Sequence, residues 1–508
     1  RRNRLRRSFS FCIALLITSI ITFVQWYPTL QLISFSARDL NAAMWQKGGW
    51  FLPWEHLAQF IAPDFFGNPA TLNYWGVWNY AEFVGYIGIV PLIFVLFAIL
   101  FRHDRKTWFF TALGAGALVF ALPNYISKLP FVLNIPFIST AQPTRLLFIV
   151  DFAFAVLTAL GFDYFFRERK KLFVPIGIIT TLYGFLWAAT SILPRPEIAF
   201  FGDRVEIARQ NLILPGVLIL ASWVTWFVVR HLPKRQVVAY LFIILAAADM
   251  LRFASKYTPF VDKQFLYPET TSIKYLQKHA GFSRVMFVDK RILAPNIPAM
   301  FQLQSTEGYD PLLLRDYVDI TNAMGRNKPD IRPVKDFNRI VTPHEYENPI
   351  TDLMNVEYIV SLDDLRHPKV KKVFEGEALK IYRNINAYPR AFFAEEVVIK
   401  EQKQEIINSL FDKKNNLRKT AFVQTKDSSL DGSYSSGSAK IISYAADRVE
   451  IETQNKDKGF LLLSDVYYPT WHAFIDGKET TIYKPDFLFR GIVVTKGKHR
   501  IVFLNRLF

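Results

Sequence analysis

Long apolar runs dominate the first half of the chain and are missing from the second half. Seven such runs, each ended by a charged cluster, lie between residues 9 and 252. A helix of about 20 apolar residues crosses the ~30 Å hydrocarbon core of a bilayer. The pattern therefore predicts membrane-spanning helices at 9–33, 83–101, 107–122, 143–166, 172–193, 212–230 and 236–252.

The loops between these runs differ in their content of lysine and arginine. The amino-terminal stub and the three loops on its side of the membrane hold fifteen basic residues, whereas the opposite loops hold six. Because short basic loops stay in the cytoplasm, the first set is predicted to be cytoplasmic. Seven spans then place the carboxyl-terminal half outside the cytoplasm. We expect a multi-pass protein of the cell membrane, in contact with the lipid bilayer.

The second half changes to short apolar runs bounded by turn residues, a pattern typical of strands. Residues 268–279 predict a short helix in which Pro268 occupies the first turn and Ile273 and Leu276 face inward. These features indicate a mixed α+β region at 253–400. Its strands are expected at 284–288, 356–361 and 378–382.

The last hundred residues carry the clearest strand signals. Asp476-Gly477 lies between alternating runs, and both central residues of a type I′ hairpin turn need positive φ. Lys496-Gly497-Lys498 separates a further pair of apolar runs. Residues 440–505 therefore predict an antiparallel sandwich, within a third domain at 401–508. The predicted fold class is an α-helical polytopic membrane domain (1–252, about seven helices) followed by an extracytoplasmic α+β and β-sandwich part.

Composition excludes several classes of function. The net charge is +17, but +11 of it belongs to residues 1–252, where membrane topology accounts for much of it. We therefore expect no nucleic-acid partner. Cys12 lies in the first apolar run and is the only cysteine, so no intrachain disulfide forms. The eight histidines show no ligand spacing, so no metal site is predicted. The sequence leaves the cofactor unknown.

Short motifs are spread along nearly the whole chain. They are Tyr27-Pro28-Thr29-Leu30, Ser36-Ala37-Arg38, Pro63 to Pro69, Asn79 to Glu82, Gly85 to Gly88, Pro136-Phe137, Pro143 to Phe148, Tyr468 to Trp471 and Ile475 to Lys478. Their order and the predicted topology resemble those of the bacterial YfhO family. That family comprises multi-pass proteins assigned to the GT-C type of membrane glycosyltransferases.

The resemblance implies a transferase that takes a sugar from a polyprenyl-phosphate carrier on the outer face of the membrane. Its acceptor would be a cell-envelope glycopolymer such as lipoteichoic acid. In GT-C proteins the key acidic residue lies in the first external loop, so this chain is expected to begin downstream of it. Ala141 also departs from the family's Arg-X-Pro-X-Arg pattern, which leaves Arg145 without a second arginine.

Two carboxylates at external mouths of the predicted helices are the candidate catalytic residues. Glu82 precedes the second run, and a carboxylate at membrane depth suggests a functional site. It could orient or deprotonate the acceptor, or it could simply pair with Arg145 or Arg38. Asp64 has the same chemistry, but its Asp-Phe-Phe-Gly-Asn-Pro setting also fits a capped turn.

The candidate substrate-binding residues are a cationic and an aromatic set. Arg145 could hold a carrier phosphate through its planar guanidinium, or it could reach the interface as a lone arginine or pair with Asp151. The loop 45–80 is rich in aromatics that could line a sugar or prenyl groove, or could mark a membrane interface. The full substrate-binding set is Arg145, Arg38, Tyr80, Trp75 and Trp78.

Other acidic residues in the runs have simpler interpretations. Asp163 and Asp249 are expected to cap helix ends or to pair with Arg167 and Arg252. Two further functions stay open beside sugar transfer. One is a non-catalytic membrane scaffold whose external sandwich binds a glycan. The other is a transporter of lipid-linked sugars, which would need polar residues along a path through the bilayer.

Overall fold

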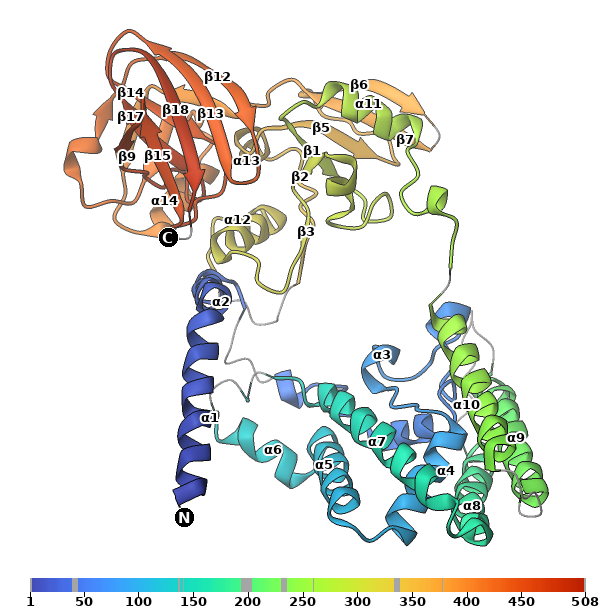
Figure 1. Ribbon diagram of the computed structural model, residues 1–508. Helices are drawn as coiled ribbons and strands as arrows, with labels where there is room; N and C mark the ends of the chain where they lie inside the picture. Colours follow the sequence, from blue (N-terminus) through green and yellow to red (C-terminus); the bar gives the residue numbers. More distant parts are fainter. Residues whose placement is uncertain are drawn as a thin grey trace. The chain divides into compact units, whose positions relative to one another are not determined.

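The computed structural model divides the chain into two compact units. It describes residues 2–38, 44–135, 138–139, 141–192, 203–229, 235–258, 260–332, 339–376 and 378–506. Arg1–Ala42 cluster with Lys263–Phe508, and Ala43–Asp262 form the other unit. Figure 1 shows the helical character of the second unit and the strands of the first. The motif Pro136-Phe137 and the last residues of two predicted spans, 193 and 230, lie outside the described residues.

The unit Ala43–Asp262 is built from helices (Figure 1). The loop before its first long helix contains the 3₁₀ turns η1 (Met44–Gln46), η2 (Trp54–Phe60) and η3 (Pro69–Thr71) and the one-turn helix α3 (Tyr80–Phe83). The longer helices are α4 (Ile89–Phe101), α5 (Arg105–Ala121), α6 (Tyr125–Val132), α7 (Leu147–Phe165, preceded by η4 at Pro143–Leu146), α8 (Phe173–Ala189), α9 (Arg204–Val229) and α10 (Arg235–Tyr257).

Helices lie in every one of the seven predicted runs, but not all are long enough to span. Four described helical segments are, by length and composition: Ser8–Phe35, Pro143–Phe165, Arg204–Val229 and Gln236–Tyr257. The pair α5 and α6, bent by 63°, raises this to five if it is one broken span. Helices α4 and α8 are apolar but shorter. The chain is therefore a membrane protein with several apolar helices, and the count of seven spans stays a prediction.

Helix α4 begins six residues later than the sequence predicts, at Ile89 rather than at residue 83. Gly88 has a φ of 98°, and a Cβ there would lie 3.1 Å from Asp249 Oδ2. That oxygen accepts a hydrogen bond from the Ile89 amide at 3.0 Å. A side chain from distant α10 thus satisfies the free amide at the start of α4. The sequence left Asp249 to cap a helix end or to pair with Arg252. It caps the start of α4, a helix other than its own, and also accepts from Tyr86 Oη at 2.8 Å.

Close approach of α4 and α7 depends on a glycine. A Cβ at Gly161 would fall deep inside van der Waals contact with the carbonyl oxygen of Phe94. Thr158, one turn earlier on α7, donates from Oγ1 to the Pro91 carbonyl at 3.1 Å. Small residues let membrane helices approach closely, and their packing replaces the hydrophobic effect that lipid abolishes.

Gly161→Ala is expected to destabilise the helical unit, although alanine is the better helix former by about 1 kcal/mol. Overpacking of a tight contact costs about 1–3 kcal/mol, which outweighs that gain. Gly116→Ala on α5 is the matched control, because a Cβ there meets nothing within 4 Å. Thermal unfolding in detergent should lower the midpoint of Gly161→Ala and leave or raise that of Gly116→Ala. Equal midpoints would contradict this packing argument.

The other unit contains helices α1 (Arg2–Ile21) and α2 (Phe23–Phe35) and the strand-rich second half. The segment after α2 pairs with this half: Ser36 forms an antiparallel bridge with Leu314, and the Ala37 amide donates to the Leu313 carbonyl at 2.8 Å. The rings of Phe35 and Tyr468 lie 5.6 Å apart. The carboxyl-terminal end of the first apolar segment is therefore the end that meets the strand-rich region.

A five-stranded mixed sheet begins that region, in the order β2-β1-β5-β7-β6. The strands predicted at 284–288, 356–361 and 378–382 are confirmed as β1, β5 and β7. The predicted helix is α11, with Ile273 and Leu276 buried; it begins after the cap Thr270, so Pro268 lies outside it. The elements are α11 (Thr271–His279), β1 (Arg284–Phe287), β2 (Gln304–Ser305), β3 (Gly308–Tyr309), α12 (Arg315–Arg326), β4 (Ile340–Val341), α13 (Pro349–Leu353), β5 (Val356–Ser361), β6 (Val370–Gly376) and β7 (Leu379–Asn384).

Two antiparallel sheets pack as the predicted sandwich, in the orders β12-β13-β18-β15-β16 and β17-β14-β8. Their inner faces share one apolar core. A third, smaller sheet has the order β10-β9-β11. The elements are β8 (Ala391–Ala394), β9 (Glu396–Ile399), α14 (Lys403–Phe411), β10 (Thr420–Val423), β11 (Gly432–Ser433), β12 (Gly437–Tyr444), β13 (Arg448–Asn455), β14 (Gly459–Leu463), β15 (Trp471–Ile475), β16 (Lys478–Thr480), β17 (Arg490–Val494) and β18 (Gly497–Asn505).

The two turn signals in this region have different outcomes. The hairpin at Asp476-Gly477 is confirmed, with φ values of 51° and 85° and Ile475 paired with Lys478. The turn near Gly497 instead links the two sheets, because β17 pairs with β14 and β18 pairs with β13 and β15. The domain divisions at 252 and 400 stay a prediction; β8 lies before residue 400 and pairs with β14.

Candidate functional site

Asp64 lies at the centre of a saturated polar cluster. Its residue is 3% exposed. Oδ1 accepts from Tyr80 Oη at 2.7 Å and from Asn68 Nδ2 at 2.8 Å, and Oδ2 pairs with Lys256 Nζ at 2.6 Å. Burial, followed by the Asp64 charge and this hydrogen bond, raises the pKa of Tyr80 above its ordinary value. Both carboxylate oxygens are thus engaged within the protein.

A small cavity adjoins this cluster. It is lined by Asp64, Tyr86, Asn211, Asp249 and Arg252, among others, and has a volume of about 30 Å³. A water molecule needs about 10–15 Å³ of such space. The cavity therefore accommodates water rather than a sugar.

Glu82 lies on α3, the same short helix as Tyr80, and has a more open setting than Asp64. Its side chain is 22% exposed, with Oε1 3.9 Å from Arg145 Nη2. Thr144 Oγ1 donates to Oε2 at 3.3 Å. Arg145 itself is 67% exposed at its side chain, so most of its donors face outward. The structure brings these two predicted site residues together as a long ion pair.

The aromatic candidates divide into an inner and an outer residue. Trp75 packs against Phe66, with ring centroids 4.8 Å apart, and Arg204 lies over its ring at 5.4 Å. Trp78 is 50% exposed and donates from Nε1 to the Gly48 carbonyl at 3.2 Å. Trp78 is the more exposed of the two.

Arg38 belongs to the other unit. There its amide donates to Ser36 Oγ at 3.3 Å, just after the bridge between Ser36 and Leu314. Its role as a substrate-binding residue stays a prediction.

Among the described residues, Asp163 and Asp151 do not form the ion pairs that the sequence suggested. Asp163 pairs with Arg102 at 3.1 Å rather than with Arg167, because α7 ends beside the start of the loop after α4. Arg145 pairs with Glu82, and Asp151 Oδ1 is buried without a hydrogen-bond partner among the residues that the structure describes.

His56 is a further buried polar residue that the sequence analysis did not single out. Its ring stacks on Phe66 at 4.4 Å, Nδ1 lies 2.6 Å from Gln59 Oε1, and Nε2 accepts from the Val77 amide at 3.4 Å. Nδ1 therefore carries the proton, and burial lowers the pKa of the ring. This neutral histidine therefore links Gln59, Phe66 and Val77 within the aromatic loop.

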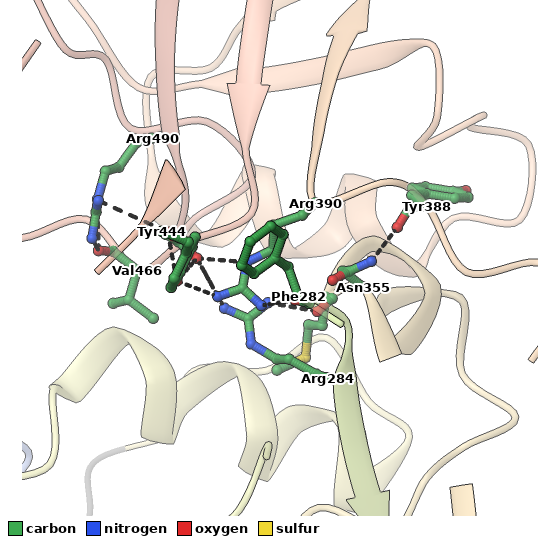
Figure 2. A network of polar contacts seen from close by, with 10 residues as sticks. Phe282, Arg284, Asn355, Tyr388, Arg390, Tyr444, Val466 and Arg490 are labelled. Atoms are coloured by element: carbon green, nitrogen blue, oxygen red, sulfur yellow. Dashed lines mark hydrogen bonds and ion pairs between the residues drawn. The ribbon is translucent and has the colours of Figure 1, made fainter. Parts of the chain in front are cut away.

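A second polar network lies in the strand-rich unit (Figure 2). Asp465, 6% exposed at its side chain, is 2.6 Å from Arg390, 3.3 Å from Arg284 and 4.0 Å from Arg490. Tyr444 Oη also donates to it at 3.0 Å. Burial would raise the pKa of Asp465, but the charges of the arginines outweigh it and hold that pKa below its ordinary value.

The three arginines of this network share the single negative charge of Asp465, which does not balance their three positive charges. Burial and then the charge of Arg390 lower the pKa of Arg284 to about 10, against the opposing effect of Asp465. Burial likewise lowers the pKa of Arg490 to about 10. Sequence reasoning missed this network because its members are separated by up to about two hundred residues. Arg390 directly precedes β8 and Asp465 closely follows β14. Charged residues next to such apolar strands were the signal that the sequence offered.

Metal-binding geometry is missing from the described part of the chain, which contains no group of three or more potential ligand side chains. Helical spans and a strand-rich carboxyl-terminal region define the class: a membrane protein with several apolar helices. The chain belongs to the family described as bacterial membrane protein YfhO, whose model matches residues 1–427 and 396–504. No curated protein matches the chain significantly, and no solved structure does so either.

Proposed function

We propose that this protein acts in the transfer of a sugar from a polyprenyl-phosphate carrier to a cell-envelope glycopolymer, by GT-C-type chemistry. Membership of the YfhO family across nearly the whole chain carries this proposal. The paired Glu82 and Arg145 supply side chains of the required kinds, a carboxylate for the acceptor and a guanidinium for the phosphate.

The reaction would take place on the outer face of the membrane. The basic end of the first apolar segment is its amino-terminal end, which the charge rule places in the cytoplasm. Its other end is the one that bonds to Leu313 and Leu314 of the strand-rich region. This arrangement supports an extracytoplasmic position for that region, without depending on the number of spans that follow.

Glu82 is the better of the two candidate bases. A general base must have a lone pair within reach of the proton it removes. Asp64 has both oxygens engaged by Tyr80, Asn68 and Lys256 and is almost fully buried. Among the described residues, Glu82 has one weak hydrogen bond and a long ion pair. We assign Asp64 a structural role.

In the proposed step, Glu82 takes the proton of an acceptor hydroxyl. The acceptor oxygen bonds the anomeric carbon as the bond from that carbon to the phosphate oxygen breaks. The electron pair leaves with the carrier phosphate, whose negative charge suits the exposed fork of Arg145. Trp78 offers an aromatic face nearby in sequence for the sugar or the prenyl chain.

Glu82→Gln is expected to lower the rate of sugar transfer by about 10²–10⁴-fold, the usual contribution of a positioned base. The measurement uses the full-length protein in proteoliposomes, a labelled polyprenyl-phosphate sugar and envelope material as acceptor. Asp163→Asn is the matched control, because it also neutralises a carboxylate paired with an arginine. Wild-type transfer by a folded Glu82→Gln protein would place the base elsewhere, such as a family carboxylate in the first external loop.

A further inference from the structure

A large polar cleft lies in the strand-rich unit, and its lining residues include neither Glu82 nor Arg145. Its volume is about 660 Å³, within the ~300–1,000 Å³ range of small-molecule sites. Four segments form its walls: the turn before β1, the start of β5, the chain from β7 to β8, and the middle of β12. They contribute residues 282–283, 355, 357, 383–385, 387–391 and 439–441.

One wall contains a buried acceptor that no described protein group satisfies. Asn355 is 4% exposed, and its Nδ2 donates to the Tyr388 carbonyl at 2.7 Å. Its Oδ1 has no hydrogen-bond partner within the described part of the chain. An unsatisfied buried polar atom costs about 1–3 kcal/mol, so this oxygen favours a ligand that brings a donor, such as a hydroxyl group.

The cleft also carries an excess of positive charge. Arg383, Arg390 and Lys440 line it against a single carboxylate, Glu357. Arg383 Nε donates to Glu357 Oε1 at 2.9 Å, and Ser283 Oγ donates to its Oε2 at 2.6 Å, so Glu357 is already engaged.

The excess of positive charge extends to the residues that lie behind the wall formed by Arg390. Arg390 shares the carboxylate of Asp465 with Arg284 and Arg490. Figure 2 shows these three arginines. Three guanidinium groups with one carboxylate leave a positive field that low-dielectric walls focus into the cleft. An anion entering it would supply the missing charge.

An apolar surface lies at the rim. Phe282 is 43% exposed and Ile385 is 52% exposed. The ring of Phe282 packs against Tyr444 at 5.5 Å, and its carbonyl accepts from Arg390 Nη1 at 3.3 Å, so its position is fixed. Rigid aromatic faces of this kind stack against the apolar faces of sugar rings, while hydroxyls reach the polar wall.

We propose that this cleft binds an anionic, hydroxyl-rich chain, either a phosphodiester-linked polyol or an acidic saccharide. The hydroxyls satisfy Asn355, the anionic group lies near Lys440 and Arg383, and the apolar face of the ligand covers Phe282. The site is built from residues other than Glu82 and Arg145, and the inference does not rest on the transfer reaction.

Binding of three defined probes to the full chain in detergent tests the proposal. The probes are a glycerol-phosphate hexamer, an oligogalacturonate hexamer and uncharged maltohexaose, with titration calorimetry as the readout. One or both anionic probes should bind, more tightly than maltohexaose and more weakly as salt rises. The stronger of the two identifies phosphate or carboxylate as the source of the charge.

Charge reversal at the cleft supplies the matched comparison. Lys440→Glu should weaken binding of the anionic probe by about tenfold, whereas Lys478→Glu on exposed β16 should change it by less than about twofold. Unchanged near-ultraviolet circular dichroism shows that both variants fold. Failure of both anionic probes to bind, or equal affinity in the two variants, would overturn the proposal. So would equally tight, Lys440-dependent binding of poly-glutamate, which has no hydroxyls and would indicate an acidic protein partner.

Discussion

Asp465→Asn is expected to lower the free energy of unfolding of the strand-rich unit by about 5 kcal/mol or more. The two side chains have nearly the same shape, so the change removes charge rather than volume. Breaking one buried ion pair by removing a partner costs about 3–5 kcal/mol. Here the change leaves Arg390, Arg284 and Arg490 without their shared carboxylate. Such an effect exceeds a third of the stability of a typical domain.

Hydrogen exchange of strand β14 in the full chain, with thermal unfolding in detergent, measures the loss. Asp476→Asn is the matched control: it makes the same substitution in the same unit, in a half-exposed pair with His499. Exposed ion pairs contribute about 0–1 kcal/mol, and Asn-Gly suits the turn as well as Asp-Gly does. If the two variants prove equally stable, Asp465 does not hold the network together.

Acid should act on the wild type in the same direction. The pKa of Asp465 in the folded protein is lowered by its arginines, so the folded state binds the proton less readily than the unfolded chain. The stabilisation is therefore complete above the ordinary carboxyl pKa. It is lost as the pH falls through the lower, folded-state pKa.

Hydrophobic patterning predicted the elements of this fold much better than their ends. The strands β1, β5 and β7 and the hairpin at Asp476-Gly477 follow from short-range patterns in a few residues. The start of α4 does not, because Asp249, some 160 residues away, supplies its cap. The link between β17 and β18 was ambiguous for a similar reason: a turn signal does not say whether the chain returns on the same sheet or crosses to the other one.

The candidate site was predictable only in part. The sequence offered the pair of Glu82 and Arg145 as one of several alternatives, because both lie at predicted helix mouths on one side of the membrane. Asp64 also stood out, but its partner Lys256, 192 residues away, could not be assigned from periodicity. Apolar spacing reports which residues are buried, and it carries no information about which charged groups meet. The charged partners are what distinguish Glu82, the proposed base, from Asp64, to which we assign a structural role.

Lys256→Met is expected to cost the helical unit about 3–5 kcal/mol, because Asp64 then stays buried as an uncompensated charge. The side chain of Asp64 is only 4% exposed, and that of Lys256 is 23% exposed. Lys171→Met, which breaks the exposed pair with Glu168, should cost less than about 1 kcal/mol. Thermal unfolding in detergent measures both changes.

The double variant Asp64→Asn, Lys256→Met then separates stability from catalysis. Neutralising both partners removes the unpaired charge, so the double variant should be more stable than Lys256→Met alone, with a coupling free energy of about 0.5–3 kcal/mol. Asparagine can still accept from Tyr80. If Asp64 is structural, this folded double variant should transfer sugar at close to the wild-type rate, while Glu82→Gln stays inactive. Transfer that is lost in the stable double variant and kept in Glu82→Gln would reverse the assignment and make Asp64 the base.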